Sequence, residues 1–268
     1  RERRSNISLR IEGSNTDQDK ITVAGRGELH LAVLIEAMRR EGYEFSISKP
    51  KVVLKMIDGQ EHEPMENVHV EVPEEYSGKV IEDLSKRKGE MRHLHTNEHG
   101  ITEMEFIMPT RGLMGYRSEF LTQTRGLGIL TSIFEDFQPT KGAIPGRARG
   151  VLISNGPGKT NAYACFNLQE RSTLFTTPGD EVYEGMIVGE NTRDNDLVVN
   201  VTKAKQLTNV RAAGSDENLL LTPPRRFTLE QAIDYIQDDE LIEVTPDSIR
   251  MRKIILSEVE RNRKGRNN

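Results

Sequence analysis

The clearest hydrophobic pattern in this chain runs from residue 67 to residue 89. Within 67–72 every second residue is valine and the residues between are polar, which is typical of a strand with one buried face. Pro73 follows, and residues 77–88 then repeat apolar positions at spacings of three and four, as an amphipathic helix does. Gly89 is expected to end this helix at the C′ position. The segment therefore predicts a strand followed directly by a helix.

The residues beyond Gly89 complete the pattern of one domain. Further apolar runs predict strands at 90–95, 101–108 and 128–137, with a shorter helix within 113–123. This gives the order βαββαβ, which is that of a ferredoxin-like domain. Residues 58–66 are polar and hold one Gly and one Pro, so we expect a linker there.

An incomplete copy of the same order precedes the linker. Alternating residues predict strands at 7–11 and 21–23, and a helical stripe at 27–40 is expected to end at Gly42. A third strand is expected to run from residue 45 past Pro50 to residue 56. This is what a βαββαβ unit leaves when its first strand and most of its first helix are absent.

From Lys141 onward, Gly, Pro and Asn separate short apolar runs. They are expected to be strands of a small sheet or barrel, at 150–154, 162–168, 181–188, 197–202 and 248–252. One helix is predicted among them, because Thr228 and Gln231 have the spacing of a capping box before an apolar face.

These patterns predict an α+β protein. Two tandem ferredoxin-like domains, the first truncated, are followed by a mostly β C-terminal domain with one helix. The expected boundaries are 1–60, 61–140 and 141–268.

Composition narrows the class of protein. With 35% hydrophobic and 29% charged residues, the 268-residue chain is expected to be globular, and no apolar run approaches the length that spans a membrane. The single cysteine, Cys165, excludes an internal disulfide and is typical of a reducing cytoplasm. Its apolar neighbours predict a buried residue and not a nucleophile. The chain starts without Met or a signal peptide, so we expect it to be cut from a longer protein.

The net charge of −5 argues against a nucleic-acid binder, but the charge is unevenly distributed. Residues 250–268 hold seven basic and two acidic residues, which fits either a solvated tail or local docking on RNA. Basic side chains bind phosphates without reading sequence. The candidate RNA-binding residues are Arg111, Arg117, Arg125, Lys141, Arg147, Arg149, Lys159, Lys203, Lys205, Arg211, Arg225, Arg226, Arg250, Arg252 and Lys253.

Two other patterns resemble catalytic or metal sites. The string NGPGKT at 155–160 resembles the end of a phosphate-binding loop, but Ile153 stands where that loop needs Gly. A strand-like run follows, so no helix is expected there to hold phosphate, and a flexible RNA-contacting loop or a hairpin turn is predicted instead. His93, His95 and His99 have a suggestive spacing but lack the cysteines or clustered carboxylates of a zinc site. No catalytic residue and no metal are expected.

Two literal strings carry a family resemblance. GRGELHL at 25–31 resembles domain III of elongation factor G, and residues 63–89 resemble its domain V. Elongation factor G itself is excluded, because it has a large domain IV between domains III and V. In this chain only a short linker separates the two segments that resemble those domains. Of the LepA-like and BipA/TypA-like branches that are left, the second is favoured, because residues 111–130, 181–200 and 221–253 are similar to its pattern.

The resemblance implies a C-terminal part of a BipA/TypA translational GTPase. GTP and Mg²⁺ would then belong to a GTPase domain that this chain lacks, so no cofactor is expected here. The implied partners are that GTPase domain, ribosomal RNA, ribosomal proteins and A-site tRNA, and the implied role is large-subunit assembly and translation under cold or other stress. Three alternatives stay open: a free-standing RNA-binding or assembly module that needs no GTP, a LepA-like fragment, and an enzyme built on the Gly-rich loop.

Overall fold

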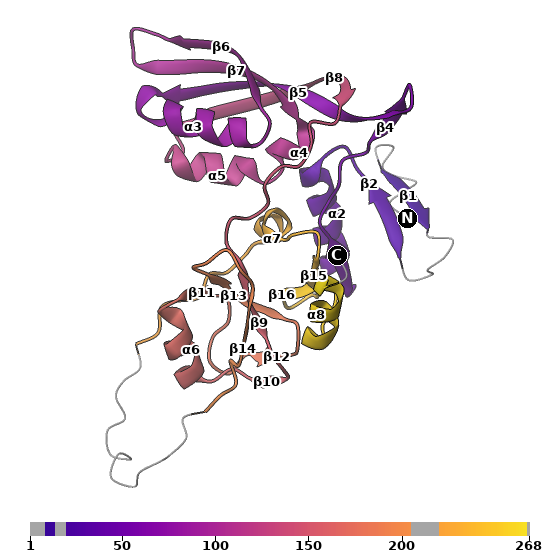
Figure 1. Ribbon diagram of the computed structural model, residues 1–268, viewed down its shortest axis with the longest axis vertical. Coiled ribbons are helices and arrows are strands. Elements are labelled where there is room, and N and C mark those ends of the chain that lie inside the picture. Colours follow the sequence, from indigo (N-terminus) through magenta and orange to yellow (C-terminus); the bar gives the residue numbers. More distant parts are fainter. Residues whose placement is uncertain (1–8, 14–19, 205–219, 267–268) are drawn as a thin grey trace. The chain divides into compact units, whose positions relative to one another are not determined.

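The computed structural model describes residues 9–13, 20–204 and 220–266 of the chain. The chain divides into two compact units. Unit 1 comprises residues 1–49, 147–232 and 236–268, and unit 2 comprises residues 50–146 and 233–235. Figure 1 shows their elements.

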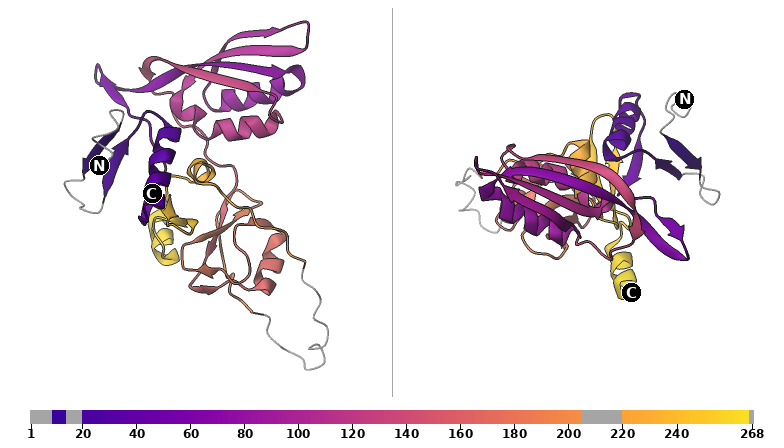
Figure 2. Two further views of the ribbon diagram at one scale, coloured as in Figure 1. Left: turned by 180° about the vertical axis from the view of Figure 1, so that it is seen from behind. Right: turned by 90° about the horizontal axis from the view of Figure 1, so that it is seen from above.

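Unit 2 is built on one antiparallel sheet with two helices packed on the same face (Figures 1 and 2). The strands follow the order β4-β5-β7-β6, and β8 pairs with the other edge of β5. Its elements are β4 (Lys55–Ile57), β5 (Gln60–Pro73), α3 (Glu74–Lys86), β6 (Glu90–Thr96), β7 (Ile101–Pro109), α4 (Thr110–Leu113), α5 (Tyr116–Gln123) and β8 (Ile129–Pro139). From β5 onward this is the predicted βαββαβ order, with the expected second helix divided into α4 and α5.

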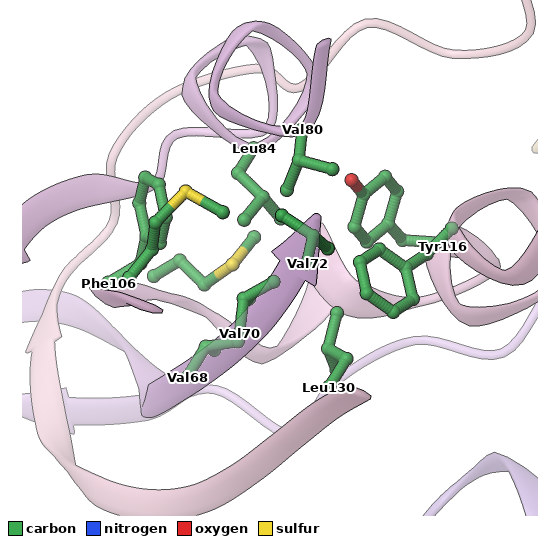
Figure 3. Packing of buried hydrophobic residues seen from close by; sticks show 11 residues of the cluster. Val68, Val70, Val72, Val80, Leu84, Phe106, Tyr116 and Leu130 are labelled. Atoms are coloured by element: carbon green, nitrogen blue, oxygen red, sulfur yellow. The ribbon is translucent and has the colours of Figure 1, made fainter. Parts of the chain in front are cut away.

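The valines of β5 enter the core of unit 2 as the alternation predicts. Val68, Val70 and Val72 are almost completely buried and pack with Leu84 of α3 and Tyr116 of α5 (Figure 3). Burying a side chain of this size contributes roughly 1.5–3 kcal/mol. The hydrophobic face of the sheet therefore holds both long helices in place.

The predicted linker at 58–66 is wrong. β4 and β5 form a hairpin whose turn is Asp58-Gly59, with φ angles of 51° and 79°. Asp-Gly is the sequence that a tight two-residue hairpin turn favours, because both of its residues adopt positive φ readily. The polar residues after Gly59 extend β5 and are not a linker.

The predicted end of helix α3 is wrong by one residue. Lys88, not Gly89, has the left-handed conformation, with φ of 69°. Gly89 is required for a different reason: a Cβ there would lie 2.8 Å from the backbone oxygen of Leu84. By contrast, α2 ends as predicted, since Gly42 has φ of 90° just beyond it.

Unit 1 combines three small sheets and a β1–β2 pair with four helices in the described residues. Its elements are β1 (Arg10–Gly13), β2 (Ile21–Ala24), α2 (Glu28–Arg40), β3 (Phe45–Ser48), β9 (Val151–Ser154), β10 (Gly158–Lys159), α6 (Ala162–Gln169), β11 (Ser172–Leu174), β12 (Glu181–Val182), β13 (Ile187–Asn191), β14 (Leu197–Val199), α7 (Leu229–Tyr235, which begins in this unit), β15 (Glu240–Val244), β16 (Ile249–Lys253) and α8 (Glu258–Arg266).

The last strand of the first segment belongs to a sheet of the C-terminal segment. The order is β16-β15-β3, with Ile47 opposite Ile242 and Phe45 opposite Val244. β3 ends at Ser48, so the expected continuation past Pro50 is wrong. Among the described residues β1 and β2 pair only with each other. The segment predicted to be a truncated first domain is thus tied to the C-terminal strands through β3.

A second sheet, ordered β11-β13-β9-β14, holds the other core of unit 1. β14 runs parallel to β9 at its edge. Leu152, Cys165 and Val199 are buried together, which confirms the expectation of a buried cysteine. The core thus depends on side chains from both sheet and helix α6.

Residues 162–168 form helix α6, so the strand predicted there is wrong. The side chain of Asn161 caps the helix by accepting a hydrogen bond from the backbone of Tyr163 at 2.9 Å. The predicted capping box at Thr228 is confirmed. The Thr228 hydroxyl accepts a hydrogen bond from the backbone of Gln231, and the Gln231 side chain accepts one from the backbone of Thr228. The α+β class is confirmed, and α6 and α8 are added to the one helix expected in the C-terminal part.

Candidate nucleic-acid interface

Lys253 lies at the centre of the most buried charge cluster of unit 1. Its Nζ lies 2.7 Å from Asp196, 2.8 Å from Asp239 and 2.9 Å from Glu240, and its side chain is 2% exposed. Arg147 completes the cluster with hydrogen bonds of 3.0 and 3.1 Å to Glu240. These two cations are held inside the fold and satisfied by carboxylates.

Glu240 and Lys253, the ion pair at the centre of this cluster, are both held in their charged forms. Burial opposes ionisation of Glu240, but hydrogen bonds from Arg147 and the charge of Lys253 outweigh it and lower its pKa. Burial likewise opposes the charge of Lys253, yet the surrounding carboxylates raise its pKa above the ordinary lysine value. Glu240 and Lys253 therefore both stay ionised at neutral pH.

Arg252 is also engaged within unit 1. Its guanidinium lies 2.8 Å from Glu243, and that carboxylate also accepts a hydrogen bond from the hydroxyl of Tyr183. Burial and this carboxylate raise the pKa of Tyr183, so the phenol keeps its proton. The predicted candidates Arg147, Arg252 and Lys253 thus hold the C-terminal strands together.

Two predicted cations of unit 2 have internal partners. Arg111 forms an ion pair with the buried carboxylate of Glu63, and Lys141 Nζ lies 2.6 Å from Glu90. Burial opposes ionisation of Glu63, but bonds from Arg111 and from the backbone of Lys141 outweigh it and lower the pKa of this carboxyl. Arg111 and Lys141 therefore fasten the chain where it leaves β8.

Arg117 and Arg125 are the predicted cations of unit 2 that face solvent. Arg117 lies on α5 and Arg125 just beyond it, and both side chains are exposed. Neither forms an ion pair within the described ranges. They are accessible to a phosphate without breaking an internal contact.

Arg149 and Arg225 converge on one carboxylate of unit 1. Glu190 lies 3.1 Å from Arg149 and 3.6 Å from Arg225, and the two arginine side chains are 57% and 47% exposed. Arg225 also lies over the ring of Phe227, 4.4 Å from its centroid. The two arginines are ordered but still accessible.

The least constrained predicted cations of unit 1 are Lys159, Lys203, Arg226 and Arg250. Lys159 is 71% exposed and its nearest carboxylate, Glu181, is 4.0 Å away. In the part of unit 1 that the structure describes, Lys203, Arg226 and Arg250 form no ion pair. The remaining two candidates, Lys205 and Arg211, lie outside the described residues.

The Gly-rich segment at 155–160 forms part of a hairpin-like connection. Gly158 and Lys159 make up β10, which pairs with β12. The expectation that no helix follows is wrong, because α6 begins at Ala162. Nucleotide binding is still unsupported, since the buried Ile153 stands where a phosphate-binding loop needs Gly.

The other candidate chemistry is equally unsupported. His93 and His95 lie on the exposed strand β6, opposite Glu105 and Glu103. No group of three or more metal-binding side chains comes together in the described residues. Burial raises the pKa of the Cys165 thiol, so its nucleophilic thiolate is disfavoured.

A groove between α6 and β14 was missed by sequence reasoning. It has a volume of about 350 Å³, and we call it the α6 groove. It is lined by Tyr163, Ala164, Asn167, Leu168, Arg171, Leu197, Val198, Val199, Asn200 and Lys203. The signal that could have revealed it is Asn161, a good helix N-cap, before apolar residues at helical spacing.

Among the described helices, none combines the length and apolar character needed to cross a bilayer.

Comparison with known families matches residues 60–148 to the elongation factor G C-terminus and residues 149–258 to the TypA/BipA C-terminal domain.

Curated relatives agree with these matches. Proteins called "Large ribosomal subunit assembly factor BipA" from Escherichia coli K12 and Haemophilus influenzae are 50% identical over 262 residues, or 97% of this chain. The Bacillus subtilis protein of the same name is 50% identical over 258 residues, or 96% of the chain. The chain spans only 42–43% of the length of these relatives. The two domain matches and these relatives show that the chain belongs to the BipA/TypA family, to whose C-terminal part it is similar.

Proposed function

We propose that this chain is the ribosome- and RNA-binding part of a BipA/TypA-type translational GTPase and acts in assembly of the large ribosomal subunit. The name of the relatives supports the assembly role, since the similarity covers almost the whole chain. Ribosomal RNA is the main partner in this proposal, together with ribosomal proteins and A-site tRNA.

The observation that carries the proposal is the division of the cations into two groups. Arg147, Lys253 and Arg111 are used inside the fold, whereas Lys159 and Arg226 are exposed in unit 1. Arg226 forms no ion pair among the described residues, and the carboxylate of Glu181 lies 4.0 Å from Lys159 with both side chains exposed. An overall acidic chain of net charge −5 that keeps exposed cations at its surface can dock locally on phosphate.

The proposed RNA-contacting set comprises those of the predicted candidates that are exposed or half-exposed. They are Arg117, Arg125, Arg149, Lys159, Lys203, Arg225, Arg226 and Arg250. Such contacts position a protein on RNA without reading its sequence, so recognition would depend on the shape of the RNA.

GTP hydrolysis would belong to the whole protein, in a GTPase domain that would hold GTP and Mg²⁺. The residues of this chain would supply the RNA contacts, and the GTPase domain would switch them on and off. The proposed setting is the cytoplasm, with a role in translation under cold or other stress.

Co-sedimentation with 70S ribosomes and with separated subunits over a salt series tests this function. The expected result is binding that includes the large subunit and falls steeply as salt rises, because each phosphate contact releases counterions. Absence of binding at low salt would contradict the proposal, as would binding that salt does not change.

A further inference from the structure

We propose that the α6 groove holds one nucleotide of a single-stranded RNA segment, with the base against Tyr163 and the phosphate near Arg171 and Lys203. This rests on the proposed RNA-binding function and assigns it a specific site. The residues that define this site lay outside the predicted RNA-binding set, apart from Lys203.

The two walls of the groove come from different elements of unit 1. One wall is a side of helix α6 and of the residues just after it. It carries three lining residues at spacings of four: Tyr163, Asn167 and Arg171. The edge strand β14 and the residues after it provide the other wall. A volume of about 350 Å³ falls in the range typical of small-ligand pockets.

The inside of the groove suits a planar base. Leu168 and Val199 belong to the buried core and form an apolar floor. Tyr163 is only half-buried and is not part of that core cluster, so its ring is available at the groove. Proteins that bind single-stranded nucleic acid commonly stack bases on such exposed aromatic rings.

The polar groups of the groove suit a nucleotide better than an uncharged ligand. Arg171 and Lys203 line it. Among the described residues no acidic side chain lines it, and neither cation forms an ion pair there. Asn167 and Asn200 add amide groups. The Asn200 carbonyl already accepts bonds from Thr202, which leaves its amide NH₂ for a ligand.

The larger groove of unit 1 does not have this character. Its volume is about 690 Å³, and it is lined by five arginines and five acidic residues. Because those charges balance, the groove as a whole does not favour an enclosed phosphate, although single arginines along it belong to the proposed RNA-contacting set. The α6 groove is smaller, but the charged side chains that line it in the described ranges are all basic.

A tryptophan placed in the groove reports on stacking directly, because the chain has no tryptophan of its own. In a Tyr163→Trp variant, a six-nucleotide single-stranded RNA should quench the indole fluorescence as the base stacks on it. Tyr43→Trp is the matched control, since Tyr43 is 55% exposed in unit 1 and lies outside the groove. Equal quenching in both variants, or none at Tyr163→Trp, would overturn the proposal.

Substitutions measure how much each group contributes. Tyr163→Leu keeps an apolar side chain and removes the ring, so RNA affinity measured by fluorescence anisotropy should fall roughly 5- to 100-fold. Arg171→Ala should weaken binding and reduce the slope of log affinity against log salt by about 0.7. The control is Arg193→Ala, an exposed arginine that does not line the groove. If Arg171→Ala behaves like this control, the assignment of the phosphate is wrong.

Three further ligands separate the alternatives. A mononucleotide that binds as tightly as the six-nucleotide RNA would show that the groove takes free nucleotides and would overturn the assignment to a strand. An acidic peptide or a duplex that binds equally well would overturn recognition of a stacked base.

The outcome is separable from that of the proposed function. Tyr163→Leu that leaves short-RNA binding unchanged while the chain still co-sediments with ribosomes would overturn only this site. Loss of short-RNA binding in Tyr163→Leu, with no ribosome binding by the unaltered chain, would support the site and contradict the ribosomal function.

Discussion

The Nζ atom of Lys253 lies 2.9 Å from an oxygen of Glu240, and the two side chains are 2% and 0% exposed. Lys253 ends β16 and Glu240 begins the neighbouring strand β15, opposite it in register. Arg147 reaches the same carboxylate from the start of the C-terminal segment. One carboxylate thus joins the β15–β16 pair to Arg147, which lies 93 residues before Glu240 in the sequence.

Removing Lys253 should destabilise unit 1 strongly. In Lys253→Met the carboxylates of Glu240, Asp196 and Asp239 lose their shared cation, and breaking a buried pair on one side costs roughly 3–5 kcal/mol. Urea unfolding followed by circular dichroism measures the change in the free energy of unfolding. Lys159→Met is the control and should change it by less than about 0.5 kcal/mol, because this lysine is exposed. Equal stability of the two variants would contradict the structural role of Lys253.

Stability should fall at acid pH and also at high pH, for opposite reasons. The pKa values of Glu63 and Glu240 are lowered in the fold, so their stabilisation is complete above the pKa of an unfolded glutamate, about 4.3, and is lost as pH falls through the folded values. The pKa of Lys253 is raised, so its stabilisation is complete below about 10.4 and is lost as pH rises through the folded value. Urea unfolding at several pH values measures both effects. A free energy of unfolding that rises from pH 5 to pH 3 would contradict this assignment.

The end of helix α3 offers a stabilising substitution. Lys88 has φ of 69°, which costs a residue with a side chain roughly 1–2 kcal/mol, so Lys88→Gly should raise the free energy of unfolding by about 0.5–1 kcal/mol. Gly89→Ala should lower it, because the new Cβ would lie 2.8 Å from the Leu84 carbonyl oxygen. Chemical unfolding of both variants measures the pair of effects. If both substitutions changed the free energy of unfolding in the same direction, the different roles assigned to Lys88 and Gly89 would be wrong.

Elements with a regular period and a local cap could be predicted from the sequence. The valines of β5 and the capping box at Thr228 are examples, because alternation along one strand and a cap formed within four consecutive residues are local properties. Helix α6 could not be recognised as easily, since its short apolar run Ala162–Gln169 fits a buried strand or a helix equally well.

Pairing between distant segments could not be predicted. Nothing near Ile47 in the sequence indicates that β3 pairs with β15, almost two hundred residues further along. The same limit applies to the predicted RNA-binding residues. Arg147 and Arg226 are both arginines in loops, and only the fold places Glu240 beside the first. The α6 groove is lined by residues of both α6 and β14. It was missed because the sequence does not show that these two elements line one groove.

Cys165 should report on opening of the core around α6. Its side chain is 1% exposed and burial raises the pKa of the thiol, so a thiol reagent should react with the native protein far more slowly than with the protein in urea. With an aromatic disulfide as the reagent, the absorbance of the aromatic thiolate that the reaction releases measures both rates. Similar rates in the two conditions would show that this core is open to solvent.

The salt dependence of ribosome binding by charge variants tests the central claim most directly. Lys159→Ala, Lys203→Ala and Arg226→Ala would be combined in one variant. Lys79→Ala, Lys86→Ala and Arg92→Ala would be combined in a control, since these three exposed cations already pair with carboxylates of unit 2. If the exposed cations of unit 1 contact RNA phosphates, the first variant should bind large subunits more weakly and lose about 2–3 from the slope of log affinity against log salt. The control should keep the slope of the unaltered chain. Equal slopes for all three proteins would contradict the account.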